Sequence, residues 1–195
     1  MKRLDLLVKG TPTVTAFTLV ETLVAIMVLT ICVVGPFQVA QGVLATAYVS
    51  RDKLIASAIA QEGMEYLRAI RDSNYLYNIH TSSTLSWLSG FDGNNGPNCY
   101  SNTCVIDTSQ YPAAVPFQAG NSIIACSDST CSTRPLYLSS SNIYNQQTSG
   151  VRTRFTRTIK LVQISATETQ VTVTVSWVGH ANYSVTLVEN IQNWL

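Results

Sequence analysis

The chain has 195 residues, enough for one domain or at most two. Charged residues make up 12% of it and hydrophobic residues 46%, which excludes a disordered, highly charged tail. A formal net charge of +1 argues against a nucleic-acid module that is basic over its whole surface. The chain has two histidines and no catalytic motif. These features favour a membrane-attached or filament-forming protein over an enzyme.

An apolar segment dominates the first third of the chain. Residues 17–37 carry a single charge, Glu21, and residues 22–50 contain no charged side chain and no histidine. Because a helix needs about 20 apolar residues to cross the hydrocarbon core, this segment predicts one transmembrane helix. The basic residues that precede it are Lys2, Arg3 and Lys9. They predict a cytoplasmic N-terminus, with the chain after residue 50 on the outer side.

Other interpretations of this segment differ in how they treat its small and charged residues. A secretory signal peptide has a small residue after its apolar core, whereas Ala16 stands before this one and Glu21 lies inside it. A lipoprotein signal needs a small residue before the cysteine, but Ile31 precedes Cys32. A plain single-pass anchor gives no role to Glu21, and an ionised side chain at the centre of a bilayer costs about 2.5–3.5 kcal/mol. The signal peptide and the plain anchor stay open as alternatives.

Residues 16–21 read AFTLVE, after a short basic leader and before the apolar run. This pattern resembles the cleavage and methylation site of type IV pilins and of the pseudopilins of type II secretion. The resemblance implies cleavage between Ala16 and Phe17 by a prepilin peptidase and N-methylation of Phe17. It also implies an assembly role for Glu21, the fifth residue of the mature chain. Ala16 departs from the glycine that is usual in the family.

Glu21 has a physical reason to act in assembly. Cleavage would create a positive amine on Phe17 at the same membrane depth, and buried carboxylates persist when they are paired. A carboxylate is also favoured near the positive end of a helix dipole. Glu21 of one subunit is therefore expected to neutralise the amine of the next and set the axial register of a filament. The alternative is a Glu21 exposed at the membrane interface without a partner.

An amphipathic helix is predicted to continue over residues 51–76. Apolar positions recur there at helical spacing: Ile55, Ile59, Gly63, Tyr66 and Ile70. Charged residues lie off this stripe, and Glu62 and Glu65 among them are explained by solvation or subunit contacts. Within the apolar half, Gly35 and Pro36 are expected to interrupt or kink the helix, because proline lacks an amide hydrogen. Residues 61–71 also resemble minor pilins of the PilV type.

The middle of the chain, residues 77–150, is rich in Ser, Asn, Thr and Gly and predicts a turn-rich insert. It holds four cysteines with matching spacing: Cys99, Cys104, Cys126 and Cys131. An even count in an exported region predicts disulfides, and four cysteines allow three connectivities. The equal spacing favours Cys99–Cys104 and Cys126–Cys131. A zinc site of four thiolates is the alternative.

Residues 151–195 alternate apolar and polar side chains and predict an antiparallel sheet. The predicted fold class is therefore α+β. A long N-terminal helix, with a transmembrane half and an amphipathic half, packs on a C-terminal antiparallel sheet, as the pilin resemblance also implies. The first strand carries a basic cluster: Arg152, Arg154, Arg157 and Lys160. This cluster could hold DNA phosphates, bind an anionic surface, pair with a neighbouring subunit, or form a solvated sheet face.

Together these features predict a minor pilin of a type IV pilus. Its predicted segments are a leader (1–16), a transmembrane assembly helix (17–50), an amphipathic continuation of that helix (51–76), a turn-rich insert (77–150) and an antiparallel sheet (151–195). The precursor is expected in the inner membrane and the assembled filament outside the cytoplasm. The expected partners are other pilin subunits, prepilin peptidase/methyltransferase, an assembly platform and membrane lipid, with no cofactor or metal. The alternatives are a type II secretion pseudopilin and an uncleaved, membrane-anchored adhesin or DNA-binding module.

Overall fold

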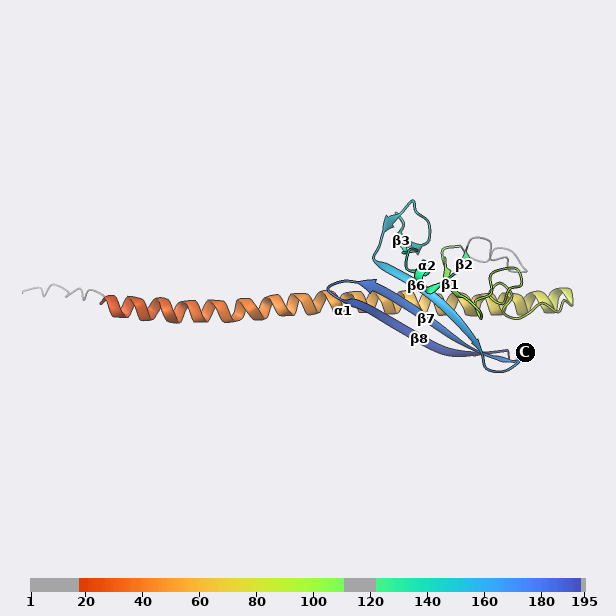
Figure 1. Ribbon diagram of the computed structural model, residues 1–195, viewed down its shortest axis with the longest axis horizontal. Coiled ribbons are helices and arrows are strands. Elements are labelled where there is room, and N and C mark those ends of the chain that lie inside the picture. The colour runs from red at the N-terminus through yellow and green to blue at the C-terminus, as the bar shows by residue number, and fades with distance from the viewer. Residues whose placement is uncertain (1–17, 111–121, 194–195) are drawn as a thin grey trace, which may run out of the picture. The chain divides into compact units, whose positions relative to one another are not determined.

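The computed structural model describes residues 18–110 and 122–193, and the rest of the chain is drawn as a thin grey trace in Figure 1. It confirms the predicted α+β class, with one long N-terminal helix, α1 (Leu19–Thr81), and a C-terminal antiparallel sheet. The chain divides into two compact units, Met1–Tyr48 and Val49–Leu195, so that α1 contributes to both. The predicted cleavage residues Ala16 and Phe17 lie outside the described residues.

In the first unit, α1 begins directly after Thr18. The Thr18 hydroxyl oxygen accepts a hydrogen bond from the Glu21 amide at 3.3 Å, and the Thr18 carbonyl accepts bonds from the next turn, as in a helix N-cap. Pro36 lies inside α1, and the helix continues on both sides of it. The helix is therefore not interrupted at Gly35 and Pro36, because the loss of one amide donor does not end a helix whose neighbouring turns remain hydrogen-bonded, and the expected kink at this pair stays a prediction.

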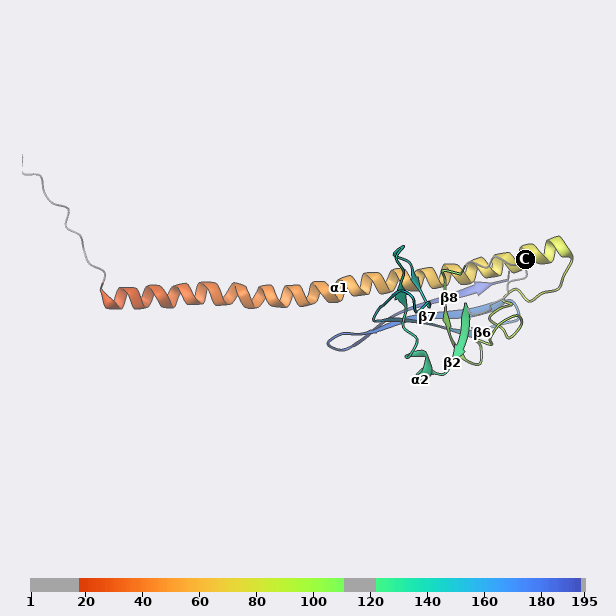
Figure 2. The same cartoon turned by 90° about the horizontal axis from the view of Figure 1, so that it is seen from above.

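The second unit is built around a five-stranded antiparallel sheet. Its strand order is β2 (Ile123–Cys126), β1 (Thr103–Ile106), β6 (Phe155–Gln163), β7 (Glu168–Val178) and β8 (Asn182–Gln192). The last three strands form the predicted meander, and the turn-rich insert adds the first two strands. Figures 1 and 2 show α1 running along this sheet over the C-terminal part of the helix.

A smaller sheet has the order β4 (Tyr144–Asn145), β3 (Tyr137–Leu138) and β5 (Val151–Arg152). The expected start of the C-terminal sheet at residue 151 therefore needs correction, because β5 pairs with β3 and the large sheet resumes only at Phe155. A short helix, α2 (Asp128–Cys131), follows β2.

The hydrophobic core lies between α1 and the sheet. Alternate residues of β7 are buried, and so is the predicted helix stripe, apart from a half-buried Ile55. The helix extends to Thr81 rather than residue 76, because polar side chains of its last turns bind the chain that returns beside it. The Asn74 side-chain amide donates to the Ser89 carbonyl at 3.0 Å, and the Asn78 side-chain amide donates to the Leu85 carbonyl at 2.8 Å.

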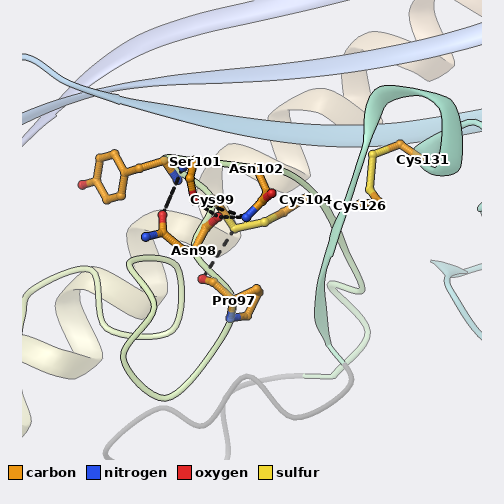
Figure 3. Close-up of a disulfide and its surroundings, with 9 residues drawn as sticks. Pro97, Asn98, Cys99, Ser101, Asn102, Cys104, Cys126 and Cys131 are labelled. Carbon is orange, nitrogen blue, oxygen red and sulfur yellow. Dashed lines mark hydrogen bonds between the residues drawn. A yellow bond between two sulfur atoms is a disulfide. The ribbon is translucent and has the colours of Figure 1, made fainter.

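Two disulfides, Cys99–Cys104 and Cys126–Cys131, confirm the favoured pairing, and they leave none of these sulfurs as a thiolate for the alternative zinc site. Figure 3 shows the first disulfide, which closes a short loop directly after Asn98. The Asn98 side-chain oxygen accepts hydrogen bonds from the Tyr100 and Ser101 amides at 3.0 and 3.1 Å. Such an Asx turn brings Cys99 next to Cys104, which lies in β1. The second disulfide links the end of β2 to α2.

Candidate functional site

The first unit presents an apolar surface on all sides of α1. Each described side chain from Leu19 to Tyr48 is exposed, including large ones such as Ile26 at 65% and Phe37 at 64%. Its threonine hydroxyls are turned inward onto the helix: Thr22 donates to the Leu19 carbonyl at 2.8 Å, and Thr30 donates to the Met27 carbonyl at 2.8 Å. These hydroxyl groups are thus satisfied by the helix itself, as an apolar environment requires.

Length and composition make α1 suitable as a membrane anchor. Within the described residues it is the one helix that is long and apolar enough to cross a bilayer, with a mean hydropathy of 2.3 over its best 18-residue window. None of that window is buried, in contrast to the core helix of a soluble protein. A signal sequence near an N-terminus would meet the same hydropathy criterion.

Glu21 is the one acidic residue in the first turn of α1, at the positive end of the helix dipole. Its side chain is exposed, and no ion pair joins it to any residue in 18–110 or 122–193. Its pairing with the Phe17 amine remains a prediction, since Phe17 lies outside the described residues.

The structure places the four members of the basic cluster in three different environments. Arg152 lies on β5 and Arg154 in the bend before β6, and both side chains are exposed. Lys160 lies further along β6, where it is half-buried and lines a different hollow. Arg157 is completely buried. The four residues therefore do not form one anion-binding face, and the assignment of Arg157 to such a contact is wrong.

Arg157 is buried because it alternates with the apolar residues of β6 on the inner face of the sheet. Phe155, Ile159 and Leu161 are buried in the same phase. Across the interface, α1 provides space at Gly63, where an added Cβ would lie 3.1 Å from the Arg157 Cδ. The two-residue period of the strand puts Arg157 on the face of these apolar residues and was therefore the signal for its burial, although the sequence analysis still counted Arg157 among the anion-binding candidates.

The buried guanidinium is held by backbone and side-chain oxygens. Its Nη1 donates to the Ile59 carbonyl at 3.1 Å and to a Glu62 carboxylate oxygen at 3.3 Å. Its Nη2 donates to the Ile106 carbonyl at 3.2 Å and to the Thr108 hydroxyl at 2.9 Å. Burial lowers the pKa of Arg157, while the Glu62 charge opposes that shift. These hydrogen bonds connect β6 to α1 and to the end of β1. Arg157 therefore stabilises the fold and is not available to bind a ligand.

The acidic residues of α1 are thus not simply solvated, as the sequence had suggested. Glu62 pairs with Arg157 and accepts a hydrogen bond from Thr108. Asp52, whose side chain is 10% exposed, pairs with Arg154 at 2.9 Å. Glu65 does match the expectation of a solvated side chain, since it is 67% exposed and pairs with Arg68 on the next turn.

A cavity of about 470 Å³ opens in the second unit beside Arg152 and Arg154. The β7–β8 hairpin supplies its aromatic wall, where Trp177 and Tyr183 stack with ring centroids 5.6 Å apart and an interplanar angle of 21°. The Phe155 ring lies against Trp177, with the two ring centroids 5.7 Å apart. Among the described residues no group of three or more His, Cys, Asp or Glu side chains could hold a metal ion. The cavity can therefore offer cationic, aromatic and neutral hydrogen-bonding contacts.

In comparisons with known proteins, no family model matches the chain, and neither a curated protein nor a solved structure is significantly similar to it.

Proposed function

We propose that this chain is a structural subunit, a minor pilin, of a type IV pilus or a related filament. In this proposal a prepilin peptidase cleaves the inner-membrane precursor between Ala16 and Phe17 and methylates Phe17. The first unit of α1 then assembles with the corresponding helices of other subunits. The second unit is displayed outside the cytoplasm, where its disulfides persist.

The observation that carries this proposal is the all-round apolar surface of α1 from Leu19 to Tyr48, interrupted by one charge at Glu21. A helix that is hydrophobic all round is stable only when it is buried, in lipid or among other helices. A filament subunit meets both conditions in turn, first in the membrane and then in the filament core. A carboxylate at Glu21 suits this path when a positive amine is created four residues before it.

The decisive test is mass spectrometry of the N-terminal peptide from full-length protein expressed with and without an active prepilin peptidase. We expect a chain that starts at methylated Phe17 when the enzyme is present and at Met1 when it is absent. Ala16→Leu should block cleavage, whereas Ala25→Leu, in the same apolar stretch, should leave cleavage intact. A chain that still starts at Met1 beside an active peptidase would refute the proposal.

A second test separates assembly from processing. Glu21→Gln should leave cleavage unchanged but remove the protein from the sheared filament fraction, since the neutral side chain cannot form an ion pair with the Phe17 amine. Glu65→Gln is the matched control, because its carboxylate is exposed on the second unit. Normal incorporation of the Glu21 variant would contradict the assigned role of Glu21.

A further inference from the structure

The cavity beside Arg152 has the size and the lining of a small-ligand site. Its volume of about 470 Å³ falls within the range of about 300–1,000 Å³ that is usual for ligand pockets. β5, the bend before β6 and the β7–β8 hairpin all contribute to its wall. Trp177 and Tyr183 lie directly opposite each other in the hairpin register, so that the aromatic wall is fixed by paired strands before any ligand binds.

The charge of the cavity suits a single anionic group. Arg154 is paired with Asp52, whereas the exposed Arg152 has no ion pair or side-chain hydrogen bond within the described part of the chain. A guanidinium presents a planar fork that binds a carboxylate through two parallel hydrogen bonds. A nucleic acid would need a row of cations along its phosphates. Arg157 is buried and Lys160 lines another hollow, so such a row is not formed here.

The other residues that line the cavity suit a ligand with hydroxyl groups and an aliphatic ring face. Ser176 and Asn182 offer neutral, exposed hydrogen-bonding side chains. Trp177 is only 3% exposed, so the half-buried Tyr183 ring is the accessible aromatic surface. A pyranose combines these needs, because it has hydroxyls at its edge and an apolar C–H face. We propose that this cavity binds a carboxylate-bearing saccharide unit, with Arg152 on the carboxylate and Tyr183 against the sugar ring.

This inference is independent of the pilin proposal, since it rests on the second unit alone. The test is a titration followed by saturation-transfer NMR on the full chain, in micelles of a detergent without a sugar headgroup. The probes are N-acetylneuraminic acid and D-galacturonic acid, each compared with its methyl ester. We expect the protein to bind at least one of the two acids and to bind its ester roughly 10- to 100-fold more weakly, since a charge-assisted contact is lost.

Arg152→Gln should weaken binding of the acid by a similar factor, whereas Lys160→Gln, outside the cavity, should not change it. Arg152 is exposed on a two-residue strand, so its replacement should leave the thermal unfolding midpoint unchanged. Tyr183→Leu should weaken acid and ester alike, because the ring contact serves both. The inference is overturned if neither acid binds, if acid and ester bind equally, or if Arg152→Gln binds as well as the unaltered protein. Tighter, Arg152-dependent binding of a single-stranded oligonucleotide would also overturn it.

Discussion

Replacing Glu62 by Gln isolates the charge that neutralises the buried guanidinium of Arg157. Gln has nearly the same shape and retains an acceptor oxygen, so the packing between α1 and β6 is preserved. The cation, however, loses the carboxylate that lies 3.3 Å from it. The hydrogen bonds from Arg157 to the Ile59 and Ile106 carbonyls remain, but neither acceptor carries a formal charge.

The expected loss of stability follows from burial. Breaking a fully buried ion pair costs about 3–5 kcal/mol. The Arg157 side chain is 0% exposed but the Glu62 side chain is 41% exposed, so water already screens part of the attraction. We therefore expect the free energy of unfolding to fall by about 2–3 kcal/mol, below the fully buried range. For a unit of this size, this corresponds to a fall of about 4–12 °C in the unfolding midpoint.

The assay is thermal unfolding of the full chain in detergent, followed by near-ultraviolet circular dichroism of the aromatic side chains in the second unit. Glu65→Gln is the matched control, because it removes a carboxylate three residues further along the same helix. That side chain is 67% exposed, and an exposed pair contributes at most about 1 kcal/mol. Equal midpoints for the two variants would refute the reasoning that Arg157 depends on Glu62.

Three further outcomes are expected from unfolding experiments on the second unit. Gly63→Ala should lower stability by about 1 kcal/mol despite the better helix propensity of alanine, because the new Cβ would lie 3.1 Å from a fixed Arg157 side chain; a higher midpoint would contradict this. Replacing Cys126 and Cys131 by Ala should cost about 2 kcal/mol in urea unfolding, and an unchanged urea midpoint would contradict it. Burial raises the pKa of Tyr66, so its contribution is complete below a pH of about 10 and is lost as the pH rises through the raised value; Tyr66→Phe should reduce that alkaline loss, and an identical pH profile would contradict it.

Local patterns in the sequence predicted much of the second unit. The disulfide pairing was predictable because each pair is separated by only 5 positions, so a turn of the local chain suffices to join it. The helix stripe and the alternation in β7 were predictable because burial follows the 3.6- and two-residue periods. Such features need no knowledge of distant contacts.

Features that depend on distant partners were not predicted. Asn74 and Asn78 stabilise the last turns of α1 by donating to the Ser89 and Leu85 carbonyls of the returning loop. The sequence around Asn74 and Asn78 does not indicate which carbonyls they will bind. The pairing of β5 with β3 likewise depends on a loop that folds back over the intervening residues. The cavity needs the β7–β8 hairpin to meet β5, so its aromatic residues and Arg152 come together only in three dimensions.

The two units of the chain differ in how their charged side chains are neutralised. In the second unit, Asp52, Glu62 and Arg157 are buried or half-buried, and partners from other elements neutralise them. In the first unit, the apolar helix offers Glu21 no such partner within the described residues. An ionised carboxylate on an otherwise apolar helix is costly unless a cation reaches it, and in the proposed filament that cation would be the amine of Phe17 in the next subunit. The proposed cleavage would create this amine, and the proposed assembly would bring it to Glu21 of a neighbouring subunit. Substitution of Glu21 is therefore a more direct test of the proposal than the shape of the fold.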